Sequence, residues 1–139
     1  MRQLLIAIAF LLCLSCARKP DAEAIRSAIA EAAEAVEAHR GANLLERVSG
    51  DFIGNDELDR EQLDRFLRMQ MIGAKSIGVS VNGIQVDVQG DRATASFEAN
   101  LTDSSGRWIP DRASTLKFET GWRRESGKWR CYNAKWTQR

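Results

Sequence analysis

We consider three side chains of the sequence as candidates for a general acid or base. His39 is the only histidine, and an imidazole has an ordinary pKa near ~6.5, so it can exchange protons near neutral pH. Asp51 and Asp56 lie close together in a turn-rich segment, where two neighbouring carboxylates could divide the roles of acid and base. His39, Asp51 and Asp56 are therefore the candidate catalytic residues.

Each of these positions also has a simpler structural role. His39 follows a predicted helix, where a cationic imidazole interacts favourably with the helix dipole. Aspartates in turn-rich segments routinely form turns and cap helices. Cys131 lies beside Arg130, which could lower the pKa of a thiol, but it occupies an apolar strand position and no histidine follows it. We favour the structural role in each case, so no catalytic residue is assigned firmly.

The composition narrows the class of protein further. A chain of 139 residues with 44% hydrophobic and 28% charged residues is ordinary for one globular domain, which excludes disorder, a collagen-like chain and a disulfide scaffold. A single histidine excludes a multi-histidine metal site, and the sequence contains no catalytic motif. We expect no metal and no cofactor.

The N-terminus has the pattern of an export signal. Arg2 precedes an unbroken apolar run, Leu4–Leu14, which is about half as long as a helix needs to cross a ~30 Å hydrocarbon core. The run ends in Cys13-Leu14-Ser15-Cys16, which resembles the bacterial lipobox. The resemblance implies that residues 1–15 are a lipoprotein signal peptide, and that Cys16 is acylated. The alternative is an ordinary secretory signal cut near Ala17.

A lipidated Cys16 implies a protein anchored in the cell envelope. Ala17, rather than an aspartate, follows the cysteine, and in the lipobox family this points to the outer membrane, facing the periplasm. Residues 16–20 would form a short tether. Removal of Arg2 with the signal leaves equal numbers of acidic and basic residues, which argues against a nucleic-acid partner.

The first half of the mature chain has helical patterns. From Ala22 to His39 apolar residues recur on one face, with Asp21 as the expected N-cap and Gly41 as the expected C′ residue. Asn43–Val48 predicts a short second helix, and residues 51–56 a loop or short strand. A further helix starts near Asp59, with Gln62 completing a capping box and with an apolar stripe of Leu63, Phe66, Leu67 and Met71.

The second half alternates apolar and polar residues with the period of a strand. The alternation changes parity at Asn82-Gly83, which means either a tight hairpin or a bulge in one long strand. It continues over residues 93–101 and 116–122, and the turn Glu125-Ser126-Gly127 leads into Trp129–Trp136. Helices followed by a curved antiparallel meander make an α+β protein.

This order of elements resembles the nuclear transport factor 2-like superfamily, in its polyketide-cyclase-like and ketosteroid-isomerase-like branch. The segments that carry the resemblance are 49–54, 90–93 and 122–130, which read SGDFIG, GDRA and WRRESGKWR. The resemblance implies a cone over residues 21–139, in which a curved antiparallel sheet wraps round a long N-terminal helix. It also implies an apolar pocket at the open end of the cone.

The inward positions argue against catalysis. They are Ala93, Ala95, Phe97, Ala99, Leu101, Leu116, Phe118 and Trp122, and none of these side chains transfers a proton. The alanines leave either a ligand cavity or room for the Ala-rich first helix to approach the sheet, and we favour the second.

These observations predict a lipid-anchored envelope protein that acts by binding. A partner protein or a small apolar ligand would meet the open end of the cone, in contact with Phe52, Trp108 and Ile109. One alternative is a small isomerase, dehydratase or cyclase that uses the three candidate residues. The other alternative is an immunity or inhibitor lipoprotein. Homodimerisation through the open sheet face is a further expectation.

Overall fold

The computed structural model describes residues 20–73, 76–103 and 115–139. The predicted signal peptide, Cys16, Trp108 and Ile109 lie outside the described residues. Within the described ranges, no helix is both long enough and apolar enough to cross a membrane.

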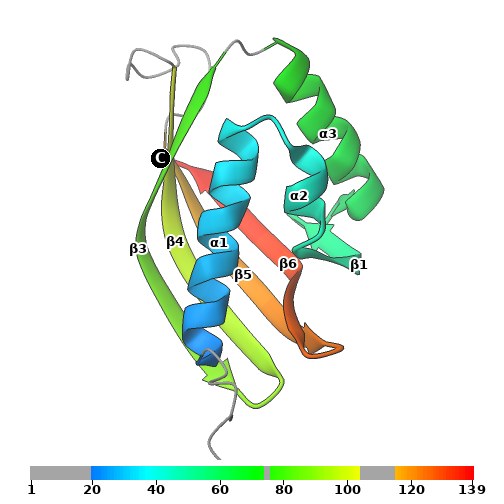
Figure 1. Ribbon diagram of the computed structural model, residues 1–139, viewed down its shortest axis with the longest axis vertical. Coiled ribbons are helices and arrows are strands. Elements are labelled where there is room, and N and C mark those ends of the chain that lie inside the picture. The colour runs from blue at the N-terminus through cyan, green and yellow to red at the C-terminus, as the bar shows by residue number, and fades with distance from the viewer. Residues whose placement is uncertain (1–19, 74–75, 104–114) are drawn as a thin grey trace, which may run out of the picture.

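Helix α1 (Asp21–Glu37) lies along the concave side of the sheet (Figure 1). Its buried residues include Ile25 and Ile29, as the sequence predicted. The predicted cap is wrong, because Pro20 is the N-cap residue and no side chain caps the helix. The Asp21 carboxylate instead accepts a hydrogen bond from Trp129 Nε1 (3.1 Å) and pairs with Arg124 (2.7 Å), which ties the start of the helix to the last two strands.

The end of α1 also differs from the prediction. His39, not Gly41, is the C′ residue and adopts the left-handed conformation, with φ of 55°. The N–H of Arg40 donates to the carbonyl of Ala35 (2.8 Å) and the N–H of His39 to that of Val36 (3.1 Å), so the helix ends in a Schellman motif. Gly41 begins the short helix α2 (Gly41–Leu45).

Two short strands and a helix follow. Strand β1 (Val48–Gly54) occupies the segment predicted in part as helix and in part as loop or short strand, and β2 (Leu58–Asp59) precedes α3 (Arg60–Gly73). The capping box is confirmed, since the backbone N–H of Gln62 donates to Asp59 Oδ1 (2.8 Å) and that of Asp59 to Gln62 Oε1 (2.9 Å).

Four long strands complete a six-stranded sheet of order β2-β1-β6-β5-β4-β3 (Figure 1). They are β3 (Ile77–Gln89), β4 (Arg92–Asp103), β5 (Thr115–Glu125) and β6 (Lys128–Gln138). Neighbouring strands are antiparallel except β1 and β6, which are parallel, so the sheet is mixed rather than purely antiparallel as predicted.

The parity change in β3 is a bulge within one strand. Val81 pairs with Ala99 and Val86 with Ala95, and the register shifts between them, around Gly83 with φ of 64°. The extra residue keeps the apolar side chains on the inner face on both sides of the bulge and bends the strand. Of the two alternatives open in the sequence, the hairpin is excluded.

The core fills the space between α1 and the sheet. Ala93 and Ala95, 4% and 2% exposed, belong to one buried cluster with Ile25 and Ala28 of α1 and Trp122 of β5. Small side chains on both partners let the helix lie close to the sheet. The burial of Ala93 and Ala95 in this cluster agrees with the expectation that the alanines pack with the helix rather than line a ligand cavity.

Candidate functional site

A row of aromatic side chains crosses the inner face of the sheet beyond this core. Phe97 pairs in register with Phe118, and Phe118 with Trp136, on three adjacent strands. The rings of Phe97 and Phe118 are stacked, with centroids 5.0 Å apart, and those of Phe118 and Trp136 are 5.9 Å apart. All three side chains are half-buried, whereas Trp122 on the same face of β5 is 3% exposed. The three rings, which we call the aromatic row, form an apolar surface that the packed core covers only in part.

Helix α3 adds apolar side chains that face solvent. Phe66, Met69 and Ile72 follow one another at intervals of three residues and are 48%, 74% and 87% exposed. Leu67 is the buried residue of the predicted apolar stripe, whereas Phe66, which belongs to the same predicted stripe, faces solvent. Exposed large apolar side chains that cluster on one element are typical of contact surfaces.

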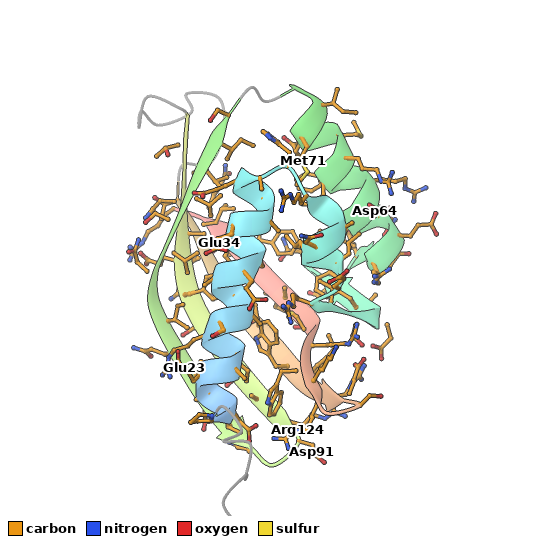
Figure 2. All side chains as sticks on the ribbon, viewed as in Figure 1. Glu23, Glu34, Asp64, Met71, Asp91 and Arg124 are labelled. Carbon is orange, nitrogen blue, oxygen red and sulfur yellow. The ribbon has the colours of Figure 1, made fainter. Side chains whose placement is uncertain are left out.

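The inner face of the described strands offers no general base at neutral pH. Arg124 (Figure 2) is ion-paired with Asp21 at the start of α1. Cys131 is buried, and this burial raises the pKa of its thiol to about 12, so the thiol stays protonated and donates to the carbonyl of Asn133 (3.2 Å). The hydroxyl of Thr120 donates to the carbonyl of Ala95 and accepts from Trp122 Nε1, each at 2.8 Å.

Asp51 lies on the outer face of the sheet, in a polar cluster that contains the charged residues Arg123 and Glu125 and the hydroxyl of Ser49. Arg123 donates to Asp51 Oδ1 (2.5 Å), to Glu125 Oε2 (2.7 Å) and to the hydroxyl of Ser49 (2.7 Å). The hydrogen bonds from Arg123 and Ser49 lower the pKa of Asp51 to about 2. Bonds from the same two residues lower the pKa of Glu125. These carboxylates are hydrogen-bond acceptors that link β1 to β5, not proton donors near neutral pH.

The other predicted residues are not gathered into one site. Asp56 is exposed, has a left-handed backbone with φ of 65° and pairs with Lys135 (3.4 Å). His39 is exposed at the end of α1, and Phe52, predicted as a contact residue, is 3% exposed in the core. Within the three described ranges, no group of three or more histidine, cysteine, aspartate or glutamate residues could hold a metal ion.

His39 is best explained by its backbone, and this gives a stability prediction. Replacing His39 with glycine is expected to raise the free energy of unfolding by about 0.5–1 kcal/mol, because glycine adopts the left-handed C′ conformation without the steric cost that a Cβ brings. The His39→Ala variant keeps that cost and serves as the control. Urea denaturation measures both. A loss of stability in His39→Gly would show that the imidazole itself makes a stabilising contact.

Comparisons with known proteins support the architecture alone. No family model matches the sequence, and no curated protein matches it. The structure is similar to an NTF2-like protein of unknown function from Pseudomonas putida (15% identity, TM-score 0.69), covering 81% of this chain and 82% of that one. It is also similar to a cystatin-like fold protein of unknown function from Nostoc punctiforme (14% identity, TM-score 0.72, 86% and 91% covered).

A third similar structure is a proposed dehydratase of the NTF2-like family from Streptomyces avermitilis, at 16% identity and a TM-score of 0.69, with 86% and 96% of the two chains covered. Sequence identities this low carry the fold and not the activity. TM-scores of 0.69 to 0.72 show that the three neighbours share the overall fold of this chain, which is a mixed, unclosed sheet curved round α1 (Figure 1). The chain has the nuclear transport factor 2-like fold, in an α+β protein whose sheet wraps an N-terminal helix.

Proposed function

We propose that the protein binds a small apolar ligand against the aromatic row Phe97–Phe118–Trp136. The observation that carries this proposal is the half-buried state of three adjacent rings next to a packed core: Phe97 and Phe118 are stacked, and Trp136 is tilted against Phe118. Aromatic side chains bury large areas, and a ligand that covers them removes that apolar surface from water. Few polar groups that could orient a reacting substrate lie on this face, since its described strand residues are almost all apolar.

The inner face of the described strands carries no group that would transfer a proton near neutral pH, and this supports binding over catalysis. An acid catalyst that works near neutral pH needs a raised carboxyl pKa, and the pKa of Asp51 is lowered instead. Asp51, Asp56 and His39 are all exposed, and the ion pairs of the two aspartates are formed with different partners. The proposed dehydratase among the structural neighbours favours an enzyme as the second candidate function.

The predicted lipid anchor completes this proposal. With Cys16 acylated and a tether of residues 16–20, the domain would lie close to the outer membrane, within ~14 Å of chain at full extension. Trp108 and Ile109 remain predicted contacts of the same ligand or of a partner protein. A protein held at a membrane surface and able to cover an apolar group would suit a ligand that is poorly soluble in water.

Native mass spectrometry tests the proposal on full-length protein recovered from the envelope of the cell that makes it. We expect an additional mass of small-molecule size in the native spectrum that is lost on denaturation. A covalent lipid on Cys16 would persist in the denatured mass, so the same experiment reports acylation separately.

Two variants locate any ligand that is found. Phe118→Ala is expected to lose the additional mass, because it removes the middle ring of the row. Lys117→Ala, on the opposite face of the same strand, is expected to retain it. Retention of the ligand by Phe118→Ala would place it elsewhere. A clean protein mass in all three samples would contradict a small ligand and redirect the search to a partner protein.

A further inference from the structure

The outer face of the sheet, opposite α1, carries a polar trough that the proposed function does not use. The trough has a volume of about 720 Å³ and is lined from four adjacent strands, β3 to β6. A second hollow of about 310 Å³ shares Gln85 and Ser96 with it, so the two lie side by side. Three interstrand steps separate β3 from β6, which gives the trough a width of ~14 Å across the sheet.

The side chains in the trough are hydroxyls, amides and carboxylates with free hydrogen-bonding capacity. In the described part of the chain, the side chains of Gln85, Thr94, Ser96 and Glu119 form no hydrogen bond or ion pair. Glu119 lies opposite Lys135, but the ammonium group of Lys135 is directed to Asp56 (3.4 Å). Carboxylate and amide oxygens accept hydrogen bonds, and amide and hydroxyl groups donate them, which is the set that neighbouring hydroxyls of a ligand can satisfy.

Tyr132 forms one end of the trough in a fixed position. It is the extra residue where the β5–β6 register shifts. Its ring lies over Gly121, where a Cβ would come within 3.0 Å of Tyr132 Cζ. The guanidinium groups of Arg92 and Arg123 each lie 5.2 Å from the centroid of the Tyr132 ring. These two cation–π contacts stabilise the position of the ring. A glycine at this position in β5 therefore lets an aromatic ring with a free hydroxyl lie flat beside the polar side chains.

The charges and polarity of the trough favour an uncharged polar occupant. The lining contains two acidic side chains, Asp87 and Glu119, and one basic side chain, Lys135. Its charges are therefore mixed, and it has neither the positive potential that an anion requires nor a purely negative potential. Tyr132 is the only large aromatic or aliphatic side chain directed to this face among the lining residues, so the trough lacks the apolar centre that a stable interface between two copies needs.

We propose that this trough binds a neutral oligosaccharide. The free carboxylate of Glu119 and the hydroxyls of Thr94 and Ser96 would bond the sugar hydroxyls, and the edge of the Tyr132 ring would close one end. The site lies on the opposite face of the sheet from the aromatic row, so it does not depend on the proposed apolar ligand.

The test is a titration of the full-length isotope-labelled protein, in a detergent without a sugar headgroup, followed by amide chemical shifts. The probes are maltotetraose, cellotetraose and chitotetraose, each up to about 10 mM, so that binding with a Kd of ~1 mM approaches saturation. We expect saturable shifts for at least one probe, confined to residues of β4, β5 and β6 on the outer face. The Glu119→Ala variant is expected to weaken that binding by about tenfold, because a charged hydrogen-bond acceptor is lost. Glu34→Ala, an exposed carboxylate on α1, should bind as the unsubstituted protein does.

Three results would overturn the proposal. The first is the absence of saturable shifts with every probe while the spectrum shows a folded protein. The second is binding that Glu119→Ala and Glu34→Ala weaken equally. The third is that self-association of the protein, without any sugar, changes the amide shifts of the trough residues, which would make this face an interface between copies. Loss of the apolar ligand in Phe118→Ala leaves the sugar titration unchanged, so the two proposals fail separately.

Discussion

Replacing Trp122 with alanine is expected to lower the free energy of unfolding by about 3–5 kcal/mol. The side chain is 3% exposed and belongs to the cluster that joins α1 to β4 and β6. Its indole N–H also donates to the hydroxyl of Thr120, which in turn donates to the carbonyl of Ala95 (both 2.8 Å). The variant therefore loses a large buried area and one member of a buried hydrogen-bond chain.

Trp136→Ala is the matched control, because it removes the same side chain from the half-buried aromatic row. We expect a clearly smaller loss of stability than in Trp122→Ala, since less apolar surface is buried there. Urea denaturation of both variants at unchanged m-value gives the comparison. If the two losses were equal, the aromatic row would be part of the core, and the argument that it is kept open for a ligand would fail.

The features that the sequence predicted best are those set by neighbouring residues. The capping box of Asp59 and Gln62 needs only residues three apart, and both of its hydrogen bonds form. Strand alternation likewise predicted the inward side chains Phe97, Phe118 and Trp122 correctly. The end of α1 shows the limit of such rules. Gly41 was the natural C′ residue, but the chain turns two residues earlier and places His39 in the left-handed region.

Contacts between distant segments were not predictable in the same way. The sequence predicts a loop or short strand from Asp51 onward, whereas Ser49 and Asp51 both lie in a strand parallel to β6 and meet Arg123, more than seventy residues away in sequence. To predict that two strands pair in parallel, one must know the whole topology, because such strands are distant in sequence. The local alternation of apolar and polar residues does not contain that information. The only signal was the spacing of two in both Ser49-x-Asp51 and Arg123-x-Glu125, which places polar pairs on one strand face.

The candidate site was predicted in part for the same reason. The alternation of apolar and polar residues predicts that Phe97 and Phe118 lie on the inner face. Their alignment with Trp136, however, depends on the register between the strands. The register between β5 and β6 shifts after Gly121, and this irregularity puts Tyr132 on the outer face and Trp136 opposite Phe118. A bulge of this kind has no reliable sequence signal in a strand without proline or an Asn-Gly pair. Both proposed binding surfaces therefore depend on one feature of the backbone that only the structure shows.

Gly54→Val is expected to lower the free energy of unfolding by about 1–3 kcal/mol, although valine is favoured in strands. A Cβ at Gly54 would lie 2.9 Å from two carbons of the Trp136 ring and 3.1 Å from Phe52 Cε1. Phe52 is buried in the core, so it cannot move away freely, and the strain must displace the indole of Trp136. We therefore expect Gly54→Val also to weaken any ligand held on the aromatic row.

Gly50 provides the control within the same strand. A Cβ at Gly50 meets nothing within 4 Å, and its backbone has no positive φ, so Gly50→Val should be neutral or slightly stabilising. Thermal and urea denaturation of the two variants separate strain at Gly54 from a general effect of valine in β1. Equal stability of the two variants would mean that Trp136 moves at no cost. In that case the aromatic row would be a mobile surface, and it would need to be ordered by the ligand rather than held ready for it.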